Sequence, residues 1–310
     1  MKIPRRTRFL QPVMIASLLA AAPSQAMIFG TDDRLERHEL PDTTALAYSR
    51  STAALVLTSH LRKNSDQSYS INWDAPGTGR AKSDGACANT FEGQPELISY
   101  CSSTLIAPDL LLTSGHCFYR GSFQTPEQVC KGSVAVFDYS LDQPSADPVH
   151  FSTSQVYACK KLEIYSHEGD LDFAVVRLDR KVSGREIFRT ATPDHSVGMK
   201  VSQSYWTSGY PRGLPNKTIL NAKYFDFWGN SNFSALFQME VMGGSSGSSV
   251  IDPVTRRIVG LVASSDCSEL EWSETNRCFY EPVFNGQCRG VRVILLENLG
   301  ISWIGTPGLL

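Results

Sequence analysis

Gly243-Gly244-Ser245-Ser246-Gly247-Ser248-Ser249-Val250 is the stretch around which the rest of the chain is organised. It lies between two apolar, strand-like runs, at residues 235–239 and 250–251. Glycines and small hydroxyl residues between two strands favour a tight turn that other groups can approach closely. Two interpretations stay open from this stretch alone. It is either a flexible Gly/Ser loop or a turn that exposes Ser246 as a nucleophile among free backbone N–H groups.

Length and composition set broad limits on the protein. The chain has 310 residues, 42% hydrophobic and 19% charged, as in ordinary soluble globular proteins. That length is enough for one large domain or two small ones. A formal net charge of -2 offers no electrostatic reason to expect a nucleic-acid partner.

Residues 1–26 are typical of an export signal. They combine a basic start, an apolar stretch over residues 9–22 and a small-x-small cleavage site at Ser24-Gln25-Ala26. The apolar stretch is too short to span a bilayer comfortably, and no later run is long enough to do so. We therefore expect a secreted or periplasmic protein that has no membrane contact once the signal is removed.

Eight cysteines follow the predicted cleavage site, and an even number in an exported chain is typical of disulfides. A zinc site needs close ligand pairs such as C-x-x-C, and the sequence has none. We therefore expect structural disulfides, with neither a metal nor another cofactor.

A predicted hairpin supplies a second signal. Residues 101–107 and 110–113 are strand-like, and Pro108-Asp109 is typical of the turn between them. This hairpin would bring Cys101 and Cys117 close enough to bridge, and would hold His116 stiffly at a strand end. A lone histidine is more often structural than catalytic. The other five histidines lack such a setting and are expected to be structural: His38, His60, His150, His167 and His195.

An acidic residue opens the apolar run at residues 172–178. Asp172 is either a solvated strand start or a carboxylate aimed at the imidazole of His116. Asp170 is the competing candidate, but Asp172 abuts the apolar run directly and is preferred.

Short strand-like runs with regular turn signals predict an all-β chain. Residues 60–96 are polar and without periodicity, which favours a surface insertion. Residues 181–196 suit a crossover between two halves of the molecule. Apolar residues at roughly helical spacing over residues 291–303 predict a short C-terminal helix.

His116, Asp172 and Ser246 follow one another in the contexts T-S-G-H-C, D-F-A-V-V-R-L and G-G-S-S-G-S. With I-F-G-T-D-D-R at residues 28–34 and G-Y-P-R-G at 209–213, the chain resembles the trypsin-like (chymotrypsin-fold) serine peptidases. Within them it is most similar to the bacterial glutamyl-endopeptidase-like branch. The resemblance covers nearly all of the mature chain except residues 60–96 and those after about 265.

The resemblance implies a peptidase domain over residues 27–310 with two six-stranded antiparallel β-barrels and the active site between them. The first barrel would span about residues 27–185 and the second about 195–310. His116 would act as the base, Asp172 would orient it, and Ser246 would be the nucleophile. The backbone N–H groups of Gly244 and Ser246 would face the oxyanion. A monomeric endopeptidase that cleaves proteins or peptides through an acyl-enzyme is implied.

Departures from the family pattern carry information about activation. Where animal relatives place an aspartate that pairs with a newly freed N-terminus, this chain has Ser245. We therefore expect signal removal alone to yield the active form.

The expected specificity pocket comprises Glu240, Val241, Val262 and Ser264. Val262 stands where glutamate-specific relatives place a histidine, which disfavours a glutamate side chain. Glu240 near the pocket base would favour Lys or Arg, although a one-residue register slip would point it away.

Three further disulfides complete the expected set. Cys130 and Cys159 flank neighbouring strands, Cys267–Cys278 closes a short loop, and Cys87–Cys288 remains by elimination. The alternative function is a catalytically silent binding protein on the same fold, which would recognise a partner through residues 60–96 and 264–285.

Overall fold

The computed structural model describes residues 28–81, 87, 91–97, 99–169, 171–191, 199–201, 203–229, 233–267, 270–283 and 288–296. The predicted export signal, Asp170 and residues 297–310 lie outside these ranges. Across the described residues, no helix has the length and apolar character that crossing a bilayer requires.

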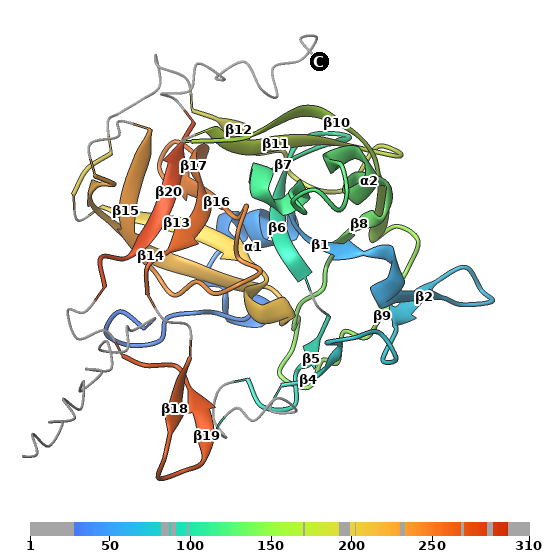
Figure 1. Ribbon diagram of the computed structural model, residues 1–310, viewed down its shortest axis with the longest axis horizontal. Coiled ribbons are helices and arrows are strands. Elements are labelled where there is room, and N and C mark those ends of the chain that lie inside the picture. The colour runs from blue at the N-terminus through green and yellow to red at the C-terminus, as the bar shows by residue number, and fades with distance from the viewer. Residues whose placement is uncertain are drawn as a thin grey trace, which may run out of the picture.

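Six antiparallel strands close into a first barrel, which occupies the right half of Figure 1. In hydrogen-bonded order these are β1 (Thr52–Leu57), β6 (Ser99–Ala107), β7 (Leu110–Thr113), β11 (Leu171–Leu178), β10 (Val156–Glu168) and β8 (Ser133–Phe137). The pairing of β8 with β1 closes the barrel. The predicted hairpin is present as β6 and β7.

A second barrel of six antiparallel strands follows, with its strands at the left of Figure 1. Its order is β17 (Arg257–Ser265), β16 (Ser249–Asp252), β13 (Ser204–Gly209), β14 (Lys217–Phe227), β15 (Ser234–Gln238) and β20 (Val291–Leu295). The pairing of β20 with β17 closes it. The short strand β12 (Arg189–Thr190), which lies in the expected crossover, adds in parallel to β17. The predicted double-barrel fold is confirmed.

The predicted C-terminal helix is wrong over its first residues, which form β20. Val291, Val293 and Leu295 all face the core of the second barrel, at the two-residue period of a strand. Two β-branched residues in that alternation favour a strand, and β17 and β15 supply hydrogen-bonding partners on both sides. The rest of the predicted helix lies outside the described residues.

Successive residues of a strand face opposite ways, so the central strands contribute to two cores. In β7, Leu111 packs inside the first barrel, whereas Leu110 and Leu112 pack between the barrels. The second barrel completes this intermediate layer with Ile251, Ile258 and Leu261. Burial stabilises each of these side chains by about 2–3 kcal/mol. The layer therefore fixes how the two barrels meet.

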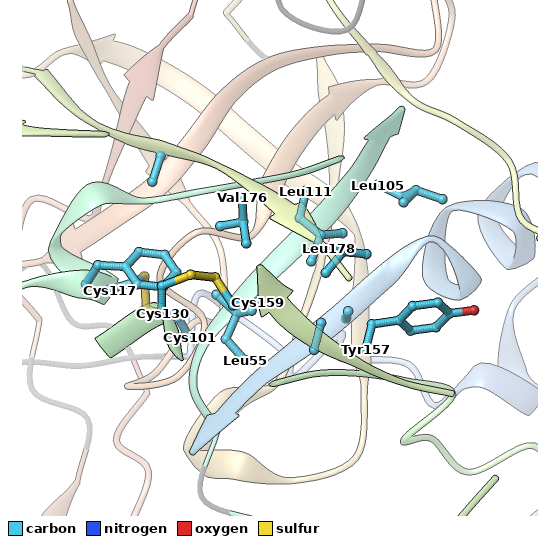
Figure 2. Packing of buried hydrophobic residues seen from close by; sticks show 14 of the residues in the cluster. Leu55, Cys101, Leu105, Leu111, Cys117, Cys130, Tyr157, Cys159, Val176 and Leu178 are labelled. Atoms are coloured by element: carbon cyan, nitrogen blue, oxygen red, sulfur yellow. A yellow bond between two sulfur atoms is a disulfide. The ribbon is translucent and has the colours of Figure 1, made fainter. Parts of the chain in front are cut away.

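Figure 2 shows the core of the first barrel, where aliphatic side chains from all parts of the wall pack beside two disulfides. Leu55, Leu111 and Val176 are buried there. The bridges Cys101–Cys117 and Cys130–Cys159 are both present, as predicted.

Small elements decorate the barrels. Within the described ranges the helices are α1 (Thr43–Arg50) and α2 (Pro126–Lys131), and the 3-10 turns have three or four residues. One small sheet contains β2 (Leu61–Lys63), β3 (Tyr69–Ile71) and β9 (His150–Phe151). A second pairs β4 (Gly79–Arg80) with β5 (Pro95–Glu96), and a third pairs β18 (Glu271–Ser273) with β19 (Cys278–Tyr280). Part of the expected surface insertion is buried, because Leu61 and Ile71 pack with Val134 and Val136 of β8.

Two predicted disulfides, Cys267–Cys278 and Cys87–Cys288, are wrong. The structure instead joins Cys87 to Cys278 and Cys267 to Cys288. The Cys87 N–H donates to the carbonyl of Phe279, so this segment runs beside β19. Asp266 accepts hydrogen bonds from the N–H groups of Arg289 and Gly290, which draws Cys267 and Cys288 together. Closeness in sequence therefore does not identify the partners of these four cysteines, because irregular segments of the chain bring the bonded pairs together.

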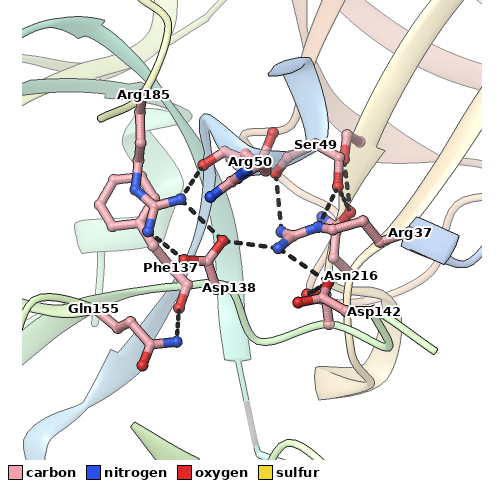
Figure 3. A network of polar contacts seen from close by, with 12 residues as sticks. Arg37, Ser49, Arg50, Phe137, Asp138, Asp142, Gln155, Arg185 and Asn216 are labelled. Atoms are coloured by element: carbon pink, nitrogen blue, oxygen red, sulfur yellow. Dashed lines mark hydrogen bonds and ion pairs between the residues drawn. The ribbon is translucent and has the colours of Figure 1, made fainter. Parts of the chain in front are cut away.

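A polar network ties the N-terminal segment, α1 and the two barrels together (Figure 3). Asp138 lies at the end of β8 and accepts from Arg37 at 2.7 Å and from Arg185 at 2.9 Å. Arg37 also donates to the hydroxyl of Ser49, which donates to Asn216 of the second barrel. Burial alone would raise the pKa of Asp138, but the hydrogen bonds and charges of the two arginines outweigh it and lower the pKa to about 2.

Replacing Asp138 with asparagine (Asp138→Asn) keeps the side-chain shape and suits the positive φ of 55°, but removes the anion from both arginines. We expect the free energy of unfolding at pH 7 to fall by about 2–3 kcal/mol. Because the pKa of Asp138 is depressed from its ordinary value of 3.8, its contribution is present above that value and lost as the pH falls towards 2. Urea unfolding at pH 7 and pH 3 should show the variant and the wild type converging in acid.

Asp74→Asn is the matched control, since Asp74 forms an exposed ion pair with Arg62. Its effect on the free energy of unfolding should stay within about 0.5 kcal/mol. Equal losses in the two variants would contradict the stabilising role assigned to Asp138.

Candidate functional site

His116 lies just beyond β7, in the 3-10 turn Gly115–Phe118. Its neighbour Cys117 is bridged to Cys101 of β6, which anchors the turn to the barrel wall. A Cβ added to Gly115 would come within 1.8 Å of the carbonyl oxygen of Ser166 in β10. Only glycine fits before His116, and the histidine is therefore held by backbone packing on one side and by a disulfide on the other.

Asp172 lies near the start of β11, is 6% exposed and contacts His116 twice. Oδ1 accepts from the backbone N–H of His116 at 2.7 Å, and Oδ2 lies 2.7 Å from its Nδ1. An ionised carboxylate only accepts hydrogen bonds, so this contact assigns the proton to Nδ1 and leaves Nε2 as the basic atom. Of the two acidic candidates, Asp172 is brought to His116, and Asp170 lies outside the described residues.

The charge of Asp172 follows from these contacts. Burial alone would raise its pKa, but the hydrogen bonds and charge of His116, together with the charge of His167, lower the pKa below its usual value. The carboxylate is therefore ionised at neutral pH, as is required to stabilise a cation on His116.

Ser246 lies in the turn between β15 and β16. Its carbonyl accepts from the N–H of Ser102 in β6 at 2.8 Å. Gly247 has φ +82°, and an added Cβ would come within 2.1 Å of the Thr113 hydroxyl at the end of β7. The turn therefore lies against the strand that leads into His116. The described residues include no hydrogen bond between the Ser246 hydroxyl and His116.

The backbone N–H groups of Gly244 and Ser246 donate to no acceptor within the described part of the chain. By contrast, the N–H groups of Ser245, Gly247 and Ser248 all donate to carbonyls. Gly244 has φ +92°, and a Cβ there would come within 2.5 Å of the carbonyl of Tyr210. The two unused donors are those that the sequence predicts for an oxyanion.

Ser245 is buried, and its hydrogen bonds within the described part of the chain are local. Its hydroxyl accepts from the N–H of Met242 at 3.3 Å, and its own N–H donates to the Met242 carbonyl. A serine offers no charge for an N-terminal ammonium group, as the sequence predicts.

The four expected pocket residues lie in different surroundings in the described part of the chain. Val241 and Val262 pack in the core of the second barrel, and Ser264 is exposed at the end of β17. Glu240 is 4% exposed. The cavity that borders Glu240 and Val241 has a volume of about 10 Å³, room for at most one water.

Glu240 is instead covered by the N-terminal strap, which we define as residues 28–36. The carboxyl accepts from the Phe29 N–H at 2.9 Å and contacts Asp33. Burial, followed by the hydrogen bond and charge of Asp33, raises the pKa of Glu240 well above its ordinary value. A neutral carboxyl that already has partners gives no reason to favour Lys or Arg in a substrate, so that hypothesis loses its physical basis.

Two groupings bring three potential metal-binding side chains together among the described residues. They are Cys101, His116 and Cys117, and Asp266, Cys267 and Cys288. In each grouping the two cysteines share a disulfide, so no thiolate is available to a metal.

Sequence reasoning overlooks His167. It is the cross-strand partner of Asp172 in the β10–β11 hairpin, and its Nδ1 lies 3.4 Å from Asp172 Oδ1. A signal exists in the sequence, because His167 and Asp172 flank a turn that contains Gly169. Pairing the two positions across that turn would have placed both side chains on one face.

The packing of Gly247 generates a stability prediction. Gly247→Ala should lower the free energy of unfolding by about 2–4 kcal/mol, because the new methyl group overlaps Thr113 and Ser102. Gly121→Ala is the control: Gly121 also has positive φ, but no atom lies within 4 Å of its added Cβ. It should cost only the conformational strain, about 1 kcal/mol. Urea unfolding distinguishes the two, and equal losses would refute the packing argument.

The neutral state of Glu240 generates a pH prediction. Glu240→Gln keeps an acceptor for the Phe29 N–H and replaces the proton shared with Asp33 by an amide N–H. Since the pKa of Glu240 is raised in the fold, the stability that its proton provides is full below its ordinary value of 4.5 and declines as the pH rises. The free energy of unfolding of the variant should therefore rise relative to that of the wild type, by up to about 1.4 kcal/mol for each pH unit above 4.5.

Chemical unfolding between pH 5 and 8 measures this difference. The exposed Glu274→Gln serves as the control and should follow the wild type at every pH. A constant difference between Glu240→Gln and the wild type would show that Glu240 is ionised in the fold.

The chain is similar to known proteins in sequence and in fold. A family model for the trypsin-like peptidase domain matches residues 101–261, which is more than half of the chain. Similar solved structures include a glutamyl endopeptidase in complex with MPD, at 15% identity and TM-score 0.47, covering 90% of this chain and 99% of that one. Another is the VesB protease of Vibrio cholerae, at 15% identity and TM-score 0.48, covering 88% of this chain and 68% of that one. The family match, on a chain folded as two antiparallel barrels, shows that the protein belongs to the trypsin-like peptidases and is a serine endopeptidase.

Proposed function

We propose that this protein is an exported endopeptidase whose catalytic triad is His116, Asp172 and Ser246. The observation that carries the proposal is the pair of 2.7 Å contacts from Asp172 to the Nδ1 and backbone N–H of His116. They hold the imidazole in one orientation and in the tautomer whose Nε2 can accept a proton.

The reaction then follows from the residue types. Nε2 of His116 takes the proton of the Ser246 hydroxyl as the oxygen attacks the substrate carbonyl. The free N–H groups of Gly244 and Ser246 stabilise the resulting oxyanion by about 3–4 kcal/mol per donor. The imidazolium gives its proton to the leaving amine, and water then hydrolyses the acyl-enzyme by the same steps.

Export and activation complete the proposal. The signal at residues 1–26 would direct the chain out of the cytoplasm, where four disulfides can form and persist. Ser245 offers no partner for a freed N-terminus, so signal removal alone would yield the active monomer. Substrates are proteins or peptides, and Val262 in place of a histidine disfavours glutamate before the cleaved bond.

A fluorophosphonate probe, which reacts with an activated serine, tests this proposal. The wild type should be labelled, Ser246→Ala should not, and Asp172→Asn should react about 10⁴-fold more slowly. Ser248→Ala is the control from the same turn: the Ser248 hydroxyl is buried without a hydrogen bond among the described residues, so its loss should preserve labelling.

A peptide library adds the substrate readout. Glutamate should show no enrichment before the cleaved bond, and Glu240→Gln should leave the profile unchanged. Folded wild-type protein that is neither labelled nor active on any peptide would instead favour the silent binding protein.

A further inference from the structure

The carboxylate of Asp172 lies beside two histidines, His116 and His167. In the β10–β11 hairpin, His167 lies directly opposite Asp172, so their side chains share one face of the sheet. His167 Nδ1 lies 3.4 Å from Asp172 Oδ1, the oxygen that also accepts from the backbone N–H of His116. The carboxylate is thus contacted by one imidazole on each side.

His167 is also close to His116 itself. The two ring centroids are 6.1 Å apart, and the ring of Tyr119 lies 4.9 Å from that of His167 on the other side. The His167 side chain is 34% exposed, so it can exchange protons with solvent. A proton on His167 would place a positive charge beside the base of the proposed triad.

Other ionisable groups surround this arrangement. Tyr165 of β10 has a pKa raised by burial, then by the charge of Asp172, with smaller effects from Tyr119, Glu127 and Glu168. Asp172 approaches His167 most directly, and the rings of Tyr119 and His116 lie next to it. Since both histidines lie beside the same carboxylate, a positive charge on one ring repels a positive charge on the other.

We propose that His167 is a positioning residue for catalysis: its protonated form shares the charge of Asp172 and keeps His116 free of a proton into more acidic solution. The role rests on the proposed triad, because His167 acts only through Asp172 and His116. Two unit charges about 6 Å apart in a water-like medium shift a proton equilibrium by about half a pH unit. The consequence is an acidic limit of activity that His167 extends downwards.

Opposite substitutions test this role. The second-order rate of fluorophosphonate labelling is measured from pH 5 to 9 for wild type, His167→Asn and His167→Arg. Asparagine cannot be protonated, so the acidic limb of the rate profile should move to higher pH by about half a unit. Arginine is always charged, so the limb should move to lower pH. His150→Asn, an exposed histidine on β9, should leave the limb in place.

The outcomes separate the two proposals. Limbs that move in opposite directions support the role of His167. Two results overturn this role in favour of a packing role for His167. In one, the acidic limb stays fixed while both variants are labelled more slowly; in the other, it moves in the same direction in both variants. Folded wild-type protein that is not labelled at any pH overturns the proposed triad, and the role of His167 with it. Circular dichroism of each variant shows that it is folded before its rates are compared.

Discussion

Gly247 lies so close to Thr113 and Ser102 that a side chain at this position would overlap both residues. This contact joins the second barrel to the first at the place where β7 leads into His116, one residue away from Ser246. The apolar layer between the barrels, which includes Leu112 and Ile251, fixes the position of one barrel relative to the other. The relative position of Ser246 and His116 therefore follows from backbone packing between the barrels, and does not depend on a direct contact between the two side chains.

Three buried or partly buried carboxyl groups show how surroundings decide charge. Asp172 and Asp138 each receive hydrogen bonds from cationic or proton-donating partners, and the pKa of each is lowered. Glu240 is buried beside another acid, and its pKa is raised. Asp172 is charged beside the imidazole of His116, and Asp138 is charged between two arginines from different segments. The third remains neutral and has a structural use in holding the N-terminal strap.

The sequence could predict the features that depend on local patterns. Apolar runs and turn signals place most barrel strands, and Asp172 is preferred over Asp170 because it adjoins such a run. The helix predicted from residue 291 onwards is wrong over residues 291–295, because five residues do not distinguish helical from strand spacing when nearly every side chain is buried. Glu240 misleads for another reason, since its partner Phe29 is 211 positions away. The pairing of Cys87 likewise depends on a partner 191 positions away, whereas the contact of His167 with Asp172 spans only a short turn.

The N-terminal strap has a consequence for the order in which the molecule can be assembled. Ile28 pairs with Val283, and Arg34 forms an ion pair with Glu281, 247 positions later. The N-terminal strap thus reaches its native position only after nearly all of the polypeptide has been synthesised. Such long-range pairing slows folding, because the cost of closing a long loop must be met before the contacts form.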